Sequence, residues 1–177
     1  MRTIEWDNGV VKMIDPRLLP GVFEVAEVAD HREVGRAIRE MVIRGAPAIG
    51  AAAAFGMALA ARQSRAAERA SLRRDLESAA DVLRQSRPTA VNLSWAIDRM
   101  LRVAADENLA TVDDVRGAIL ADAQALADED VAINKRMAAH GAALVKDGDS
   151  ILHHCNTGAL ATVDYGTALG VIRMAHE

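Results

Sequence analysis

The sequence predicts an α/β protein in which a small N-terminal β unit packs on a helical layer and is followed by the start of a Rossmann-like parallel α/β domain. Three observations support this fold class. Apolar and polar residues alternate around an Asn-Gly turn in residues 3–28, residues 31–145 have helical periodicity, and a strand-like apolar run follows the turn at 146–149. We therefore expect an N-terminal domain over residues 1–147 and a second domain that begins at residue 148 and is incomplete at residue 177.

A hairpin signal indicates the N-terminal strands. Thr3–Trp6 and Val10–Ile14 flank the dipeptide Asn8-Gly9, which favours a tight turn because both residues accept a positive φ. Val22–Val28 alternates in the same way, so we expect it to add a third strand.

The first helix is expected to begin after Asp30, whose carboxylate can accept hydrogen bonds from the free N–H groups of the first turn. We expect this helix to end at Gly45, and its apolar stripe consists of Val34, Ile38, Met41 and Val42. Pro47 then fits the first turn of an Ala-rich helix over about 48–62, because a proline at that place loses no hydrogen bond.

Three more helices are predicted at about 65–85, 90–106 and 112–145. Pro88 disfavours helical geometry at the preceding residue, so Arg87 is expected to lie at a helix boundary. Thr111 and Asp114 have the spacing of a capping box, in which each side chain bonds to the backbone of the other, and they predict where the last of these helices begins.

Composition limits the possible functions. The net charge of −4 provides no broad basic surface, which argues against nucleic-acid binding. A single cysteine allows no internal disulfide, and the N-terminus has no apolar leader, so we expect a cytoplasmic protein. The longest uncharged run, residues 46–61, is mostly Ala and Gly and falls short of the roughly 20 apolar residues that a membrane span requires.

The most informative segment lies near the C-terminus, where Ile151–His154 is expected to form a buried parallel strand that ends at Cys155. Side chains at the carboxyl ends of parallel strands project into the crevice in which open α/β sheets bind their ligands. The N–H groups of a helix that starts nearby would favour the thiolate form of this cysteine. The alternative is a thiol in the core, because free cysteine is among the most buried residue types.

Arg44 and Arg87 are candidate anion-binding residues, since both lie at predicted helix boundaries. A helix N-terminus offers unpaired N–H groups and a partial positive charge, and an adjacent arginine adds paired donors. The run Arg44, Gly45, Ala46 therefore fits a phosphate site. For each arginine the alternative is an exposed residue at a helix end that binds no ligand.

Neither a metal nor a nucleotide cofactor is expected. His153, His154 and Cys155 are adjacent, but neighbouring residues on a strand point to opposite faces, and the three lack a recognised zinc-ligand spacing. The glycines that follow Cys155 do not have the G-x-G-x-x-G spacing of dinucleotide-binding loops.

Three long motifs resemble one family of enzymes. They are Ile43–Gly50 (IRGAPAIG), Arg87–Leu93 (RPTAVNL) and Ser150–Arg173, and their order is that of the S-methyl-5-thioribose-1-phosphate isomerases of methionine salvage. The wider family also includes ribose-1,5-bisphosphate isomerases and regulatory subunits of a translation initiation guanine-exchange factor. Because members of this family are considerably longer, the resemblance implies that this chain corresponds to an N-terminal half.

The resemblance implies an isomerase that converts methylthioribose 1-phosphate, an aldose derivative, to the corresponding ketose without a metal or redox cofactor, and that acts as a homodimer. Arg44–Ala46 and Arg87 match family residues that bind the sugar phosphate. Cys155 matches an active-site cysteine that works beside an aspartate located beyond Glu177. The alternatives are a ribose-1,5-bisphosphate isomerase, a non-catalytic regulatory subunit, and an inactive fragment.

Overall fold

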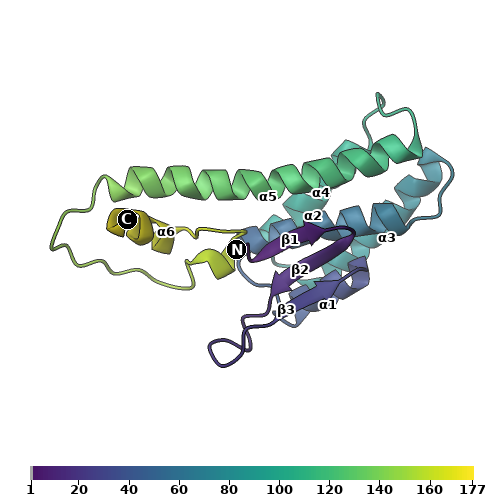
Figure 1. The fold of residues 1–177 in the computed structure, drawn as a ribbon. Helices are drawn as coiled ribbons and strands as arrows, with labels where there is room; N and C mark the ends of the chain where they lie inside the picture. The colour runs from purple at the N-terminus through teal and green to yellow at the C-terminus, as the bar shows by residue number, and fades with distance from the viewer. Residues whose placement is uncertain (1) are drawn as a thin grey trace.

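The computed structural model describes residues 2–177, which form one three-stranded antiparallel sheet and six α-helices (Figure 1). The elements in chain order are β1 (Ile4–Asp7), β2 (Val10–Ile14), β3 (Val25–Val28), α1 (His31–Arg39), α2 (Ala46–Gln63), α3 (Arg69–Ser86), α4 (Val91–Ala104), α5 (Val112–Ala142), the short 3-10 helix η1 (Ala159–Ala161) and α6 (Ala168–His176). The long helix α5 runs along the molecule, and α6 lies beside its C-terminal half.

The predicted hairpin is confirmed. β1 and β2 pair in antiparallel register with Asp7 opposite Val10, and the turn residues Asn8 and Gly9 have φ values of 50° and 95°. The third strand is shorter than expected and begins at Val25. Before it, Val22 N–H donates to the Leu18 carbonyl in a turn, so the chain from residue 18 to 22 is not extended.

Helix α1 begins as predicted but ends earlier. The Asp30 carboxylate accepts a hydrogen bond from Arg32 N–H at 2.6 Å, which caps the helix. The helix stops at Arg39 instead of Gly45, because Met41 takes a left-handed conformation with φ of 60° and its side chain is 49 % exposed. This reversal turns Val42 and Ile43 into the core.

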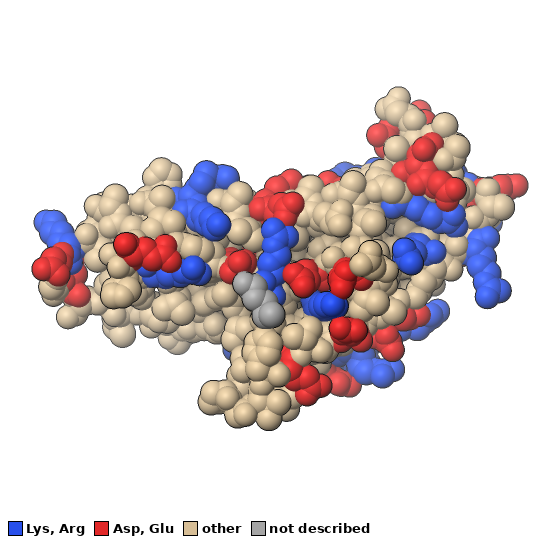
Figure 2. All heavy atoms as spheres, in the orientation of Figure 1, with Lys and Arg blue, Asp and Glu red and all other residues tan. Residues whose placement is uncertain are grey.

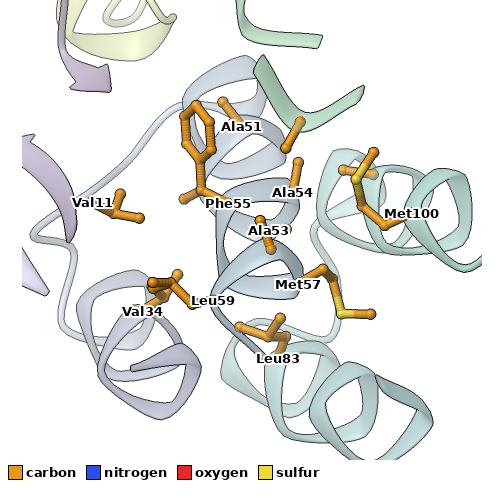
Figure 3. Close-up of a cluster of buried hydrophobic side chains, with 14 of the residues drawn as sticks. Val11, Val34, Ala51, Ala53, Ala54, Phe55, Met57, Leu59, Leu83 and Met100 are labelled. Carbon is orange, nitrogen blue, oxygen red and sulfur yellow. The ribbon is translucent and has the colours of Figure 1, made fainter. Parts of the chain in front are cut away.

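Helix α2 lies at the centre of the protein and contacts α1, α3, α4, α5 and β1. Every residue from Ala48 to Ala61 is buried, and most of them are alanine. Figure 3 shows the alanines of this helix facing larger side chains of the surrounding elements, among them Met100 of α4 and Leu83 of α3. Small side chains let the neighbouring backbones approach closely, so the helix can be packed on all sides.

The boundaries of the outer helices are near those expected. Arg87 follows the last residue of α3 with φ of −155° and ψ of 80°, a non-helical conformation that Pro88 favours. The capping box at the start of α5 is formed: Thr111 Oγ1 accepts from Asp114 N–H at 3.0 Å, and Asp114 Oδ2 accepts from Thr111 N–H at 2.8 Å. Arg99 joins α4 to α5 through ion pairs with Asp122 and Glu129.

The predicted strand at Ile151–His154 was wrong for this structure, in which the segment is an exposed loop and Leu152 is 98 % exposed. A strand needs a neighbouring strand to satisfy its backbone N–H and C=O groups. Within residues 2–177 the one sheet is β1-β2-β3, and this segment does not pair with it. A Rossmann-like second domain beginning at residue 148 therefore stays a prediction.

In residues 2–177, none of the helices combines the length and the apolar character needed to cross a membrane.

The packing of α2 predicts that Ala54→Leu will destabilise the fold. Ala54 is fully buried, and extra methylene groups in a close-packed core cost about 1–3 kcal/mol. Ala139→Leu on the exposed face of α5 is the matched control, because the same side chain is added where there is room. Urea unfolding of both variants measures the difference, and equal stabilities would contradict this account of the core.

Candidate functional site

The turn between α1 and α2, which we call the Arg44 turn (residues 44–46), has the geometry of an anion site. The Arg44 side chain is exposed, and within residues 2–177 it makes no ion pair. Gly45 is the residue before α2, with φ of 94° and ψ of 135°, and Ile49 N–H donates to its carbonyl at 2.9 Å. The first amides of an eighteen-residue helix thus lie within two residues of an exposed arginine in the sequence, which is the combination that anion sites at helix N-termini use.

Gly45 lies directly against the segment that follows Cys155. A Cβ atom placed on Gly45 would be 2.2 Å from the carbonyl oxygen of Ala161 and 2.4 Å from its Cα. Only a residue without a side chain fits a backbone-to-backbone contact of this kind, and the positive φ also favours glycine. The structure thus brings together two of the motifs that are far apart in the sequence.

Two polar residues hold this C-terminal segment, and sequence reasoning missed both. Thr3 N–H donates to the Val163 carbonyl at 2.8 Å, and Thr3 Oγ1 donates to the Ala159 carbonyl at 2.8 Å. Asp130 of α5 accepts a hydrogen bond from Val163 N–H at 2.8 Å. Burial raises the pKa of Asp130 above its ordinary value, and the bond from Val163 N–H opposes that rise. These contacts join residues very distant in sequence, so no local pattern signals them.

Arg87 lies at the end of α3, where its side chain is half-buried. The helix that follows, α4, starts next to the first turns of α2, because a Cβ placed on Gly50 would meet the backbone carbonyl of Asn92 at 3.4 Å. The Arg87 motif is thereby brought beside the helix that the Arg44 turn begins. Within the described chain, no hydrogen bond joins Arg87 to the Arg44 turn or to Cys155.

A cavity of about 170 Å³ opens between α2, α4 and α5, next to the Arg44 turn. Its walls are mostly apolar, and its two charged residues are acids. The lining residues are Pro47, Gly50, Asn92, Trp95, Leu126, Glu129, Asp130 and Ile133. An apolar ligand group fits such a lining better than an anionic one.

Cys155 lies in the exposed loop, with φ of 73°, and not at a strand end. Two residues later, Thr157 connects this loop to α6. The Thr157 hydroxyl accepts from Leu169 N–H at 3.1 Å and is 3.1 Å from His153 Nδ1, while the Thr157 carbonyl accepts from Thr167 N–H at 2.8 Å. The cysteine therefore lies in a segment tied to α6 on one side and to the Arg44 turn on the other.

Charged groups are distributed without a dominant sign. Figure 2 shows acidic and basic side chains interspersed on the face in view.

Over the described range 2–177, no three His, Cys, Asp or Glu side chains are grouped closely enough to hold a metal ion.

Comparison with known proteins gives consistent matches over the whole chain. The model of the initiation factor 2 subunit family matches residues 42–177. Methylthioribose-1-phosphate isomerases are 53 % identical in Geobacter metallireducens, covering 99 % of this chain and 51 % of that protein, and 47 % identical in Synechococcus sp., covering 99 % and 50 %. The chain thus spans about half the length of the curated relatives it matches.

Two solved structures share the fold. The 5-methylthioribose 1-phosphate isomerase of Pyrococcus horikoshii superposes with a TM-score of 0.93 at 44 % identity, covering 99 % of this chain and 49 % of that one. A protein of A. fulgidus described as the translation initiation factor eIF-2B subunit delta superposes with a TM-score of 0.89 at 46 % identity, covering 99 % and 51 %.

The contact at Gly45 predicts that Gly45→Ala will destabilise the protein more than a glycine substitution without neighbours. Forcing an alanine into this backbone region costs about 1–3 kcal/mol, and the Cβ would also displace Ala161. Gly148→Ala is the matched control, since Gly148 has φ of 84° but nothing within 4 Å of the added atom. Urea unfolding compares the two, and equal losses would mean that the contact with Ala161 contributes nothing.

Proposed function

The chain belongs to the initiation factor 2 subunit family, and from this premise we propose that it carries the phosphate-binding turn and the reactive cysteine of a methylthioribose-1-phosphate isomerase. The reaction converts 5-methylthioribose 1-phosphate to 5-methylthioribulose 1-phosphate. The observation that carries the proposal is the backbone contact between Gly45 and Ala161, which connects the Arg44 turn to the segment behind Cys155. High identity over the whole chain to proteins named for this activity supports it.

The phosphate is proposed to bind at the N-terminus of α2. The N–H of Ala46 and the Arg44 guanidinium offer donors there, and the partial positive charge of the helix end favours an anion. Arg87 supplies a second guanidinium from the neighbouring helix boundary. Arginine suits this task because its planar group donates two parallel hydrogen bonds to phosphate oxygens.

Cys155 is proposed to act on the charge that develops while the sugar ring opens and hydrogen moves between C1 and C2. Such a group works best where water is excluded. In this structure the thiol is exposed. We therefore propose that residues 151–154 become a strand of a parallel sheet in the complete enzyme, which would cover the exposed side chains of Ile151 and Leu152 and place the cysteine at a strand end.

The cavity beside the Arg44 turn favours a methylthio sugar over a bisphosphate. A second phosphate in that cavity would lie against Glu129 and Asp130, and the described residues that line it include no lysine or arginine. Like charges at short range repel each other. The methylthio group is apolar and matches Trp95 and Ile133.

A regulatory subunit is the second candidate, because one structural neighbour is described as an eIF-2B subunit.

We also propose a cytoplasmic homodimer that does not bind nucleic acid. A single cysteine fits a reducing compartment, and the net charge of −4 does not favour a polyanion.

Removing either phosphate arginine should weaken ligand binding. Arg44→Ala and Arg87→Ala are each expected to cost about 1.5–3 kcal/mol in affinity for methylthioribose 1-phosphate, the usual contribution of a charged hydrogen bond. Isothermal titration measures this. Arg73→Ala is the control, since Arg73 pairs with Glu77 on the exposed surface of α3. Unchanged affinity in both variants would remove Arg44 and Arg87 from the site.

Replacing the cysteine should strongly lower turnover and leave binding intact. The 177-residue chain is to be mixed with the separately produced second half of the Geobacter metallireducens relative, and ketose formation followed by NMR. We expect product from the mixture and none from the chain alone. Cys155→Ser should lower the rate by about 10²–10⁴, the range for a group that handles a proton in the transition state.

The controls for this assay are the melting temperature and the ligand affinity of the Cys155→Ser chain. Preserved turnover with a lowered melting temperature would identify a structural thiol. Binding of the sugar phosphate without turnover by any combination of the two halves would favour the regulatory subunit.

A further inference from the structure

We propose that Asp130 is a positioning residue, whose half-buried carboxylate holds residues 159–163 against the Arg44 turn and thereby sets the geometry of the phosphate site. The inference rests on the proposed function, because it assigns the residue a task at that site. Asp130 lies on α5 and belongs to none of the three sequence motifs.

The hydrogen bonds around Val163 show how the segment is held. Asp130 Oδ2 accepts from Val163 N–H at 2.8 Å, and the Val163 carbonyl accepts from Thr3 N–H at 2.8 Å. Val163 is fully buried, so both of its backbone groups need protein partners. The bonds from α5 and from the residue before β1 supply them and fix the segment from two sides.

Within the described chain, Asp130 makes this hydrogen bond without a cationic partner, which is unfavourable for a bond that serves only to stabilise the fold. Within residues 2–177 no lysine, arginine or histidine forms an ion pair with it, and the acid before it, Glu129, is already paired with Arg99. One turn further along α5, the buried Asn134 lies next to Asp130, and its side-chain amide counteracts the rise that burial causes in the pKa of the Asp130 carboxyl. Burial of a carboxylate without a cationic partner reduces stability, and carboxyl groups whose pKa is raised by their surroundings are concentrated at functional sites.

The path from Asp130 to the site is short and rigid. Ala161 is two residues before Val163, and its backbone touches Gly45 with no room even for a methyl group. A shift of residues 159–163 must therefore move the Arg44 turn or open a gap beside it. Asp130 also lines the same cavity as Pro47, which lies in the first turn of α2.

The test compares Asp130→Ala and Asp130→Asn in the 177-residue chain. Titration with methylthioribose 1-phosphate gives affinities, and NMR gives the hydrogen exchange of Val163 N–H and the amide shifts of Gly45 and Ala46. Asp130→Ala should weaken binding about tenfold or more, the effect of losing one charged hydrogen bond. Asp130→Asn should stay within about threefold of the parent, because its amide oxygen still accepts from Val163 N–H.

The control is Asp128→Ala, which removes an acid from the exposed side of the same helix, where it pairs with Arg2, and should leave affinity unchanged. If Asp130→Ala does not fold, Thr3→Val takes its place, since it removes the bond to the Ala159 carbonyl and keeps the shape of the side chain. That variant should then bind the ligand more weakly.

Three outcomes would overturn the proposal. The first is unchanged affinity of Asp130→Ala together with rapid exchange at Val163 N–H, and the second is an equal loss of affinity in Asp130→Asn and Asp130→Ala. The third applies if Asp130→Ala is unfolded, and it is full affinity in Thr3→Val. If the parent chain binds no methylthioribose 1-phosphate, the proposed function fails instead. The amide shifts then decide about Asp130, because unmoved Gly45 and Ala46 signals in Asp130→Ala would contradict the positioning role.

Discussion

The burial of α2 on all sides is the constraint on which the rest of the structure depends. Four α-helices, the 3-10 helix η1 and the strand β1 contact this one helix, which leaves no polar face for it. Alanine and glycine make this possible, because a helix with large side chains would hold its neighbours further away and leave voids between them. The chain has only 3 % aromatic residues, so it achieves a dense core through close approach of backbones and not through large side chains.

The burial of α2 also limits where a ligand can bind to this helix. Since the sides of α2 are covered, its polar ends are the parts of this helix that remain available, and its N-terminal end carries the partial positive charge. Gly45 and Pro47 shape that end: glycine allows the backbone contact with Ala161, and proline begins the helix without losing a hydrogen bond. The stability of the core and the proposed phosphate site thus depend on the same few residues.

The sequence allowed prediction of features that local chemistry determines. Asn8-Gly9, Asp30, the Thr111 capping box and the boundary at Arg87 each act over a few residues, and all were found as expected. The predictions failed where contacts between residues distant in the sequence determine the local structure. Helix α1 ends early because Met41 takes a left-handed conformation that turns Val42 and Ile43 into the core, and the conformation of Gly45 is fitted to Ala161, more than a hundred residues away.

In the candidate site, too, only residues within recognisable sequence motifs could be predicted. The Arg44 and Arg87 motifs could be recognised from the sequence, and their roles stay predictions. Thr3 and Asp130 could not be found, because an ordinary threonine and one acid among 25 carry no signal until the fold places them beside Val163. A strand at 151–154 was expected from its apolar pattern alone, although pairing in a sheet also requires a second strand.

The segment from Cys155 to Val163 is held in place near Val163 and exposed near Cys155. This difference suggests an order of events for the proposed reaction. Its far end is held by Gly45, Thr3 and Asp130. If the Arg44 turn binds phosphate as proposed, this preformed arrangement would lower the entropic cost of binding. Its near end, with the cysteine, is exposed and is connected to α6 through Thr157. Ordering of residues 151–154 would therefore be transmitted through Thr157 to the first turn of α6. If the Arg44 turn and Cys155 act as proposed, phosphate would bind first and the reacting carbons would be enclosed afterwards, so water would be excluded after substrate capture.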